Sequence, residues 1–104
     1  MLDDILKKAD ELVHGNRNDL YGDPIDDYSK VVEIYKAISG IDLNPEDGAL
    51  FMVAVKLARI ATNYRENIIH RDSLIDAAGY LWVFGSIIES RNERTELPPY
   101  GIVK

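Results

Sequence analysis

The sequence predicts an all-α protein, with one four-helix, bundle-like domain over residues 1–90 and a C-terminal tail over residues 91–104. Two observations lead to this prediction. Apolar residues recur every three to four positions in four separate segments, which is the spacing of amphipathic helices. No segment alternates apolar and polar residues as a half-buried strand does. A chain of 104 residues is long enough for one domain with one hydrophobic core.

The first helix is expected over residues 2–14, where the apolar residues form one stripe and Gly15 provides a stop. The segment 14–24 that follows is polar and contains two glycines and a proline. It lacks helical or strand periodicity, so it is predicted to be a loop.

The second helix is expected over residues 24–39. Asp23 and Pro24 have the residue types of an N-cap and a first helical position, and Gly40 ends the segment. The apolar residues at helical spacing are expected to be buried along one stripe: Ile25, Tyr28, Val31, Val32, Tyr35 and Ile38.

The third helix has the clearest start in the chain. Asn44 is the expected N-cap, Pro45 the first helical residue, and Glu46 and Asp47 fill the first turn. The body of this helix, residues 48–62, is apolar on nearly every face. A helix of that kind is central or shared with another subunit, so we expect a homo-oligomer.

A polar connection over residues 64–71 leads to the fourth helix, which is expected over residues 72–90. Pro98 and Pro99 stop any helix after it, so the remaining residues are predicted to be a tail.

The composition limits the classes of partner. The net charge is −6 and the isoelectric point is near 4.8, so the surface does not attract a phosphate backbone and an extended nucleic acid is not expected. The chain has no cysteine, which excludes disulfides and thiolate metal sites. The acidic, amphipathic N-terminus is unlike a signal peptide, and no apolar run reaches the roughly 18 residues of a spanning helix. We therefore expect a cytoplasmic protein without a membrane partner.

Charged residues lie within the two apolar helices at 48–62 and 72–90, where they are costly unless they are paired or used. Folding these helices back as an antiparallel pair about residue 68 places Arg59 near Asp76 or Ala77. The same folding places Lys56 near Gly79 or Tyr80. Neighbours three or four positions apart share a helix face. One cluster is therefore expected: Lys56, Arg59, Asp72, Asp76 and Tyr80.

Two interpretations of this cluster remain open. One is a structural ion-pair network, in which Arg59 pairs with Asp76 and Asp72 only caps a helix. The other is a polar pocket, in which the cations hold a phosphate or carboxylate. In that pocket the carboxylates hold ribose hydroxyls, an amine or Mg²⁺, and Tyr80 stacks on a base.

Further candidate ligand-binding residues flank this cluster in the sequence. Before the second helix, Tyr21, Gly22 and Asp23 form either a lid with backbone N–H groups open to an anion or a plain helix cap with a turn glycine. The basic residues of these connections complete the candidate set: Arg17, His70 and Arg71. The chain has no histidine and carboxylate set with zinc spacing, and no P-loop, catalytic triad or dinucleotide motif.

Three stretches carry a resemblance that covers roughly residues 3–90: G-N-R-N-D-L-Y-G-D-P, N-P-E-D-G-A-L-F-M-V-A-V-K-L-A-R and H-R-D-S-L-I-D-A-A-G-Y. With these stretches the chain resembles a family of small phage and prophage proteins of unassigned function. The resemblance implies that the cytoplasm of a host cell is the site of action.

That family is similar to the all-α nucleoside-triphosphate pyrophosphatases, the MazG-like and dimeric dUTPase group, which implies a small, helical and oligomeric architecture. These enzymes gather Mg²⁺ with acidic pairs on two helices. Asp72 and Asp76 match the second pair at a four-residue step, whereas Lys56 and Arg59 stand where glutamates are expected. Two cations cannot ligate Mg²⁺, so the function that remains is anion binding.

The first expectation is therefore a protein that binds a small, nucleotide-like anionic ligand without a cofactor or turnover, for example to sequester a host antiphage-defence signal. The alternative is a Mg²⁺-dependent nucleoside-triphosphate pyrophosphohydrolase, with the ion held by Asp72, Asp76 and a carboxylate such as Glu33 or Asp47. A second alternative is a structural or interaction oligomer with a charged core network.

Overall fold

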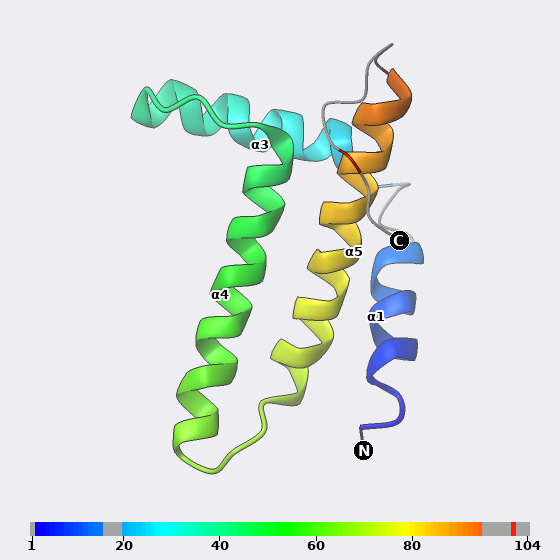
Figure 1. The fold of residues 1–104 in the computed structure, drawn as a ribbon, viewed down its shortest axis with the longest axis vertical. Coiled ribbons are helices and arrows are strands. Elements are labelled where there is room, and N and C mark those ends of the chain that lie inside the picture. The colour runs from blue at the N-terminus through cyan, green and yellow to red at the C-terminus, as the bar shows by residue number, and fades with distance from the viewer. Residues whose placement is uncertain (1, 16–19, 95–100, 102–104) are drawn as a thin grey trace.

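The computed structural model describes residues 2–15, 20–94 and 101. The described elements are all helical and are labelled as in Figure 1: α1 (Ile5–His14), α3 (Pro24–Ser39), α4 (Pro45–Arg65) and α5 (Arg71–Arg94). No strand occurs in the described residues, so the predicted all-α, bundle-like fold is confirmed. Within the same residues, no helix is long and apolar enough to cross a membrane.

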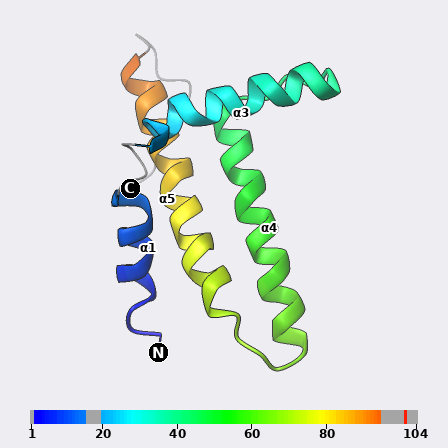
Figure 2. The same ribbon diagram turned by 180° about the vertical axis from the view of Figure 1, so that it is seen from behind.

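Helix α5 is the centre of the fold and contacts each of the other three labelled helices. Helices α4 and α5 form an antiparallel pair, and α1 runs along the side of α5 that faces away from α4 (Figure 1). Helix α3 crosses the end of this arrangement and extends beyond α4, as both ribbon views show (Figure 2).

The N-terminal part of the chain differs from the prediction at the predicted loop. Leu20 and Tyr21 have helical backbone, so the prediction of a loop over residues 14–24 is wrong at these two positions. Residues 16–19, which include the candidate Arg17, lie outside the described part of the chain. Helix α1 ends at His14 with Gly15 as its C-cap, as expected, although it begins at Ile5 instead of residue 2.

Helices α3 and α4 begin where the sequence predicts. Pro24 and Pro45 occupy the first turns, and Gly40 closes α3 in a left-handed conformation with φ of 75°. Asn44 forms a capping box, in which its backbone N–H donates to the Asp47 carboxylate at 2.9 Å.

Helix α5 is longer than predicted at both ends. It begins at Arg71, so Asp72 lies in its first turn and is not the N-cap. It continues to Arg94, four residues into the predicted tail. Ion pairs explain this extension, because Arg91 bonds to Glu46 of α4 and Arg94 bonds to Asp26 of α3. These contacts hold the last turn of α5 against its neighbours.

The hydrophobic core lies where α3 crosses the α4–α5 pair. Its members come from all four labelled helices: Val13, Ile25, Tyr28, Ala49, Val83 and Ile87. Gly48 permits this crossing, since a Cβ there would lie 3.1 Å from the Tyr28 ring. The crossing therefore fixes one end of the molecule.

The predicted burial of the α3 stripe is wrong in the second half of the helix. Ile25, Tyr28 and Val32 are buried as predicted. Val31, Tyr35 and Ile38 were predicted to be buried but are 45%, 42% and 81% exposed. The physical reason is that α3 runs past the edge of α4, so its distal turns have no labelled helix beneath them (Figures 1 and 2). The apolar stripe is present without the element that would cover it.

Candidate functional site

The register of the α4–α5 pair is set by the connection between the helices. Asn67 turns the chain with φ of 59°, and residues 68–70 are not helical. In Figure 1 this segment runs back along α4 before α5 begins. Extended residues cover about 3.3 Å each, against 1.5 Å in a helix. Compared with a tight hairpin, these three extended residues therefore place each residue of α5 opposite a position roughly three to four residues earlier on α4.

This shift changes the central ion pair of the candidate cluster. The Lys56 ammonium nitrogen lies 3.0 Å from Asp76 Oδ2, with the two side chains 12% and 32% exposed. The pairing of Arg59 with Asp76 that the sequence predicted is therefore replaced by Lys56 with Asp76. Within the described residues Arg59 is exposed and forms no ion pair.

Asp76, Gly79 and Tyr80 come together on α5 beside a small cavity of about 160 Å³. The opposite wall comes from Leu12 and Val13 of α1. A Cβ on Gly79 would meet these two side chains at the ordinary van der Waals distances of 3.4 and 3.5 Å, so the wall of the cavity has room for a methyl group at this position. Of the predicted cluster, Asp76 and Tyr80 line this cavity, Lys56 pairs with Asp76, and Arg59 and Asp72 are not among the lining residues. The helix facing the cavity is α1.

A larger groove of about 320 Å³ lies at the crossing of α3 and α4. Aromatic and apolar side chains line it: Tyr28, Val31, Val32, Tyr35, Leu43, Phe51, Met52 and Tyr80, with the backbone of Gly48. Tyr80 lines both this groove and the Asp76 cavity. The sequence prediction missed the groove, because α3 residues at helical spacing were assigned to the core. The available signal was Tyr28 and Tyr35, which lie seven positions apart and therefore share a face.

Two of the candidate residues near the start of α5, His70 and Arg71, form hydrogen bonds with other side chains of the protein. Arg71 donates to the Asp4 carboxylate at 2.6 Å and so fastens α1 to α5. This hydrogen bond lowers the pKa of Asp4 and raises the pKa of Arg71. His70 Nδ1 hydrogen-bonds with the buried Ser73 hydroxyl at 2.5 Å. Asp72 is exposed in the first turn of α5, where the helix dipole stabilises its negative charge.

The segment Tyr21–Gly22–Asp23 lies at the opposite end of the helix pair. Gly22 has φ of 78°, and Asp23 is the N-cap of α3. The next residues pack into the core with Val83 and Ile87, which are seven or more residues beyond Asp76. At 1.5 Å per residue this separation exceeds about 10 Å along α5. The structure therefore does not bring this segment into the Lys56–Asp76 cluster.

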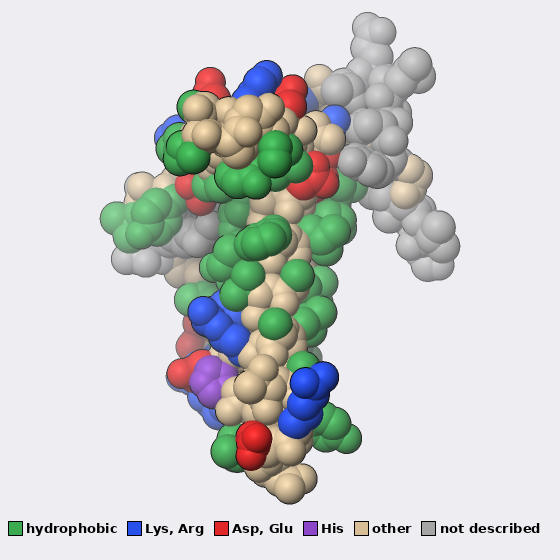
Figure 3. Space-filling view, turned by 90° about the vertical axis from the view of Figure 1, so that its left-hand side faces the viewer, with side chains coloured by type: hydrophobic (Ala, Val, Ile, Leu, Met, Phe, Trp, Pro, Cys, Tyr) green, Lys and Arg blue, Asp and Glu red, His purple; other side chains and the backbone are tan. Residues whose placement is uncertain are grey.

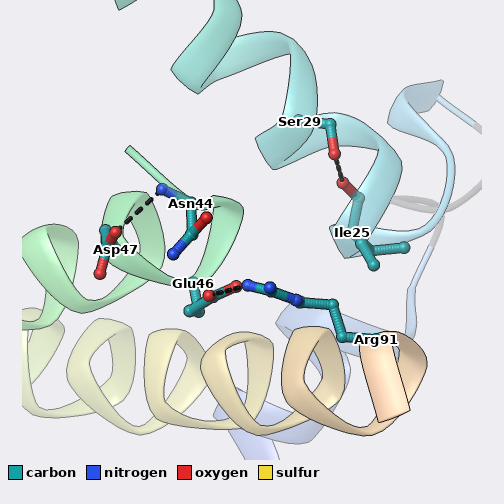
Figure 4. A network of polar contacts seen from close by, with 6 residues as sticks. All are labelled: Ile25, Ser29, Asn44, Glu46, Asp47 and Arg91. Atoms are coloured by element: carbon teal, nitrogen blue, oxygen red, sulfur yellow. Dashed lines mark hydrogen bonds and ion pairs between the residues drawn. The ribbon is translucent and has the colours of Figure 1, made fainter. Parts of the chain in front are cut away.

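A buried ion pair that the sequence prediction missed joins α4 to the end of α5. Glu46 is 2% exposed, and its Oε1 accepts a hydrogen bond from Arg91 Nη1 (Figure 4). Beside it in Figure 4, Asn44 and Asp47 form the cap of α4, and on α3 the Ser29 hydroxyl donates to the Ile25 carbonyl at 2.6 Å. The prediction assigned Glu46 only to the helix dipole and Arg91 to the tail.

Within the described residues, no three histidine or carboxylate side chains gather closely enough to hold a metal ion. Asp47 is engaged in the capping box of α4, and Glu33 is exposed on α3. The pyrophosphohydrolase alternative thus has no third ligand beside Asp72 and Asp76 in this part of the chain.

Comparisons with known proteins place this chain among phage proteins. A family model described as "Domain of unknown function (DUF6378)" matches residues 4–88. The Gene 55 protein of Mycobacterium phage L5 is 33% identical over 91 residues, which cover 86% of this chain and 56% of that protein. The Gene 55 protein of Mycobacterium phage D29 is 35% identical over 81 residues, which cover 77% of this chain and 50% of that protein.

The chain spans about half the length of these curated relatives. No solved structure matches it. The family description and the names of the relatives do not mention a pyrophosphatase, so the similarity to MazG-like enzymes stays a prediction.

Proposed function

This chain belongs to the DUF6378 family, and we propose that it is a phage protein that binds a small nucleotide-like ligand without turning it over. The observation that carries this proposal is the position of Tyr80, which lines both the aromatic groove and the cavity beside Asp76. A ligand in the groove would contact Tyr80, and the same side chain borders the cavity that Asp76 lines.

The groove has the size and the walls of a small-molecule site. Its volume of about 320 Å³ is at the lower end of the range for ligand pockets, which are mostly apolar with a few polar groups. Tyr28, Tyr35 and Phe51 offer ring faces or edges for a flat aromatic ring, and the phenols add hydrogen-bonding groups. A nucleobase is a ligand of this shape and chemistry.

The charged groups near the groove suit the polar part of such a ligand. Lys56 lies one helical turn beyond the groove residue Met52, so both are on one face of α4. Its ammonium has three donors, of which the bond to Asp76 uses one. The Asp76 carboxylate, which lines the adjoining cavity, accepts hydrogen bonds from ribose hydroxyls or amines.

Binding without turnover fits a role in sequestration. A phage protein of this type would lower the free concentration of a host antiphage-defence nucleotide in the host cytoplasm. In the resemblance to the MazG-like enzymes, Lys56 and Arg59 stand where those hydrolases have carboxylates, which favours binding over hydrolysis.

A thermal-shift screen with a panel of nucleoside mono-, di- and triphosphates and cyclic nucleotides, with and without Mg²⁺, tests this function. We expect one class of nucleotide to raise the Tm without metal, with no product formed. Tyr35→Ala and Phe51→Ala, at exposed groove positions, should reduce the shift. Leu81→Ala, at an exposed position outside the groove, is the matched control and should not. Release of phosphate or pyrophosphate with Mg²⁺ would replace this proposal with the hydrolase.

A further inference from the structure

One side of α4 is apolar from Leu50 to Tyr64, and no helix among the described residues covers it. Five exposed residues follow one another at alternating spacings of four and three: Leu50, Ala54, Leu57, Ala61 and Tyr64. The three large members are 48%, 53% and 77% exposed. Alternate spacings of four and three make up the heptad pattern by which one helix packs along another. We call these five residues the α4 seam.

We propose that the α4 seam pairs with the α4 seam of a second copy of this chain, in antiparallel orientation, to form a two-fold dimer. This inference goes beyond ligand binding, because Ala54, Leu57, Ala61 and Tyr64 do not line the groove. Two features of the described residues identify the occupant as a second copy: the alternation of side-chain size and the charges at the helix ends.

Large and small residues alternate along the seam. In an antiparallel pair this order places Leu50 opposite Ala61 of the second copy, and Leu57 opposite Ala54. Each large side chain then packs over a methyl group, so two helices approach closely without clashes. A two-fold axis between the copies makes each contact occur twice, which is how a surface becomes complementary to itself.

The charges on α4 favour the antiparallel orientation. Its first turn carries the exposed Asp47, and its last turn carries the exposed Arg65. The same antiparallel register brings Asp47 of one copy beside Tyr64 and Arg65 of the other, at both ends of the seam. A parallel pair would instead place like charges together at each end, which is unfavourable.

Exposed apolar surface also occurs outside the seam. Phe51 of α4 is 68% exposed, and the distal half of α3 carries further exposed side chains: Val31, Ile34, Tyr35 and Ile38. Figure 3 shows hydrophobic side chains gathered around the end of α3 and along the upper part of α4. Phe51 and Tyr35 line the groove with Gly48 and Met52, which lie about 160° around α4 from the seam. The proposed dimer interface therefore consists of the seam residues alone.

Light scattering coupled to size exclusion, at chain concentrations from about 1 to 100 μM, tests the dimer and its interface. We expect twice the 11.8 kDa mass of one chain. A charge in the middle of the seam, in Leu57→Glu, should weaken association at least about tenfold. Leu57 is exposed in one chain, so the variant should keep its helical circular dichroism. Leu81→Glu, an equally exposed position on α5, should leave the dimer intact.

Disulfide trapping tests the orientation, because the natural sequence contains no cysteine. Leu50→Cys and Ala61→Cys are prepared separately and oxidised alone or mixed. The antiparallel seam predicts a disulfide-linked heterodimer on mixing and little dimer from either variant alone. Disulfide dimers from each variant alone would overturn the orientation. A monomer at about 100 μM, or equal weakening by Leu57→Glu and Leu81→Glu, would overturn the interface itself.

Discussion

The Lys56 ammonium lies 3.0 Å from the Asp76 carboxylate and joins the middle of α4 to the middle of α5. Both side chains are largely withdrawn from solvent, with 12% and 32% exposed. The pair therefore has a structural role whether or not a ligand also uses it. The first prediction separates these two roles.

Lys56→Met should destabilise the fold by about 1–3 kcal/mol, because it leaves the Asp76 carboxylate partly buried without its cation. Urea unfolding measures this change. The double variant Lys56→Met/Asp76→Leu should recover most of the loss, since it removes both charges. Lys36→Met breaks the exposed pair with Asp42 and serves as the control, with an expected loss below about 1 kcal/mol. Equal losses in Lys56→Met and Lys36→Met would contradict the structural role.

Arg91→Met should cost more stability than Arg94→Met. Glu46 is 2% exposed, so loss of Arg91 leaves a buried carboxylate without this partner, at a cost of about 3–5 kcal/mol. Arg94 pairs with Asp26 at 3.1 Å on the surface, where solvent screens the attraction, so its loss should cost much less stability. Chemical denaturation of the two variants provides the comparison. The prediction fails if Arg91→Met retains the stability of Arg94→Met.

The contact between Asp4 and Arg71 should make the stability that α1 gains by packing on α5 depend on pH. The hydrogen bond from Arg71 lowers the pKa of Asp4 below its ordinary value of 3.8. A lowered folded-state pKa contributes stability above the unfolded pKa, and this contribution is lost as the pH falls through the folded value. Thermal melts from pH 6 to pH 2 should show Asp4→Asn less stable than wild type above pH 4. The difference should disappear toward pH 2, and a difference independent of pH would contradict this linkage.

Gly79 and Gly48 should respond differently to alanine. Both lie within helices, where alanine is favoured over glycine by about 1 kcal/mol. At Gly79 the new Cβ would lie 3.4 Å from Val13, an ordinary contact, so Gly79→Ala should stabilise the protein. At Gly48 the new Cβ would lie 3.1 Å from the buried Tyr28 ring. This tight contact should cancel the gain in stability from the alanine, so Gly48→Ala should not stabilise the protein. A Tm for Gly48→Ala at or above that of Gly79→Ala would contradict the close crossing of α3 and α4.

Helix starts were predictable from this sequence because their signals are local. Asn44 and Pro45, like Asp23 and Pro24, combine an N-cap with a proline in the first turn, and the structure begins α4 and α3 at these residues. The antiparallel pairing of α4 and α5 was also predictable, since a short polar connection joins two apolar helices.

The residues in contact across the helices were less predictable, because they depend on lengths and crossings that no local pattern encodes. The non-helical residues 68–70 moved the register, so Lys56 replaced Arg59 opposite Asp76. The overhang of α3 left Ile38 exposed although its spacing indicates burial. The Glu46–Arg91 pair spans 45 residues of sequence, and only the folded arrangement brings it together.

The most direct test of the proposed ligand is native mass spectrometry of the protein purified from host cells in which the antiphage-defence response is active. The account predicts a retained small molecule with the mass and fragments of a nucleotide, bound in a fixed ratio to the chain. Phe51→Ala should lose this adduct, and Leu81→Ala should retain it. A wild-type protein that carries no small molecule, and binds none of the nucleotides added at about 100 μM, would contradict the proposed function.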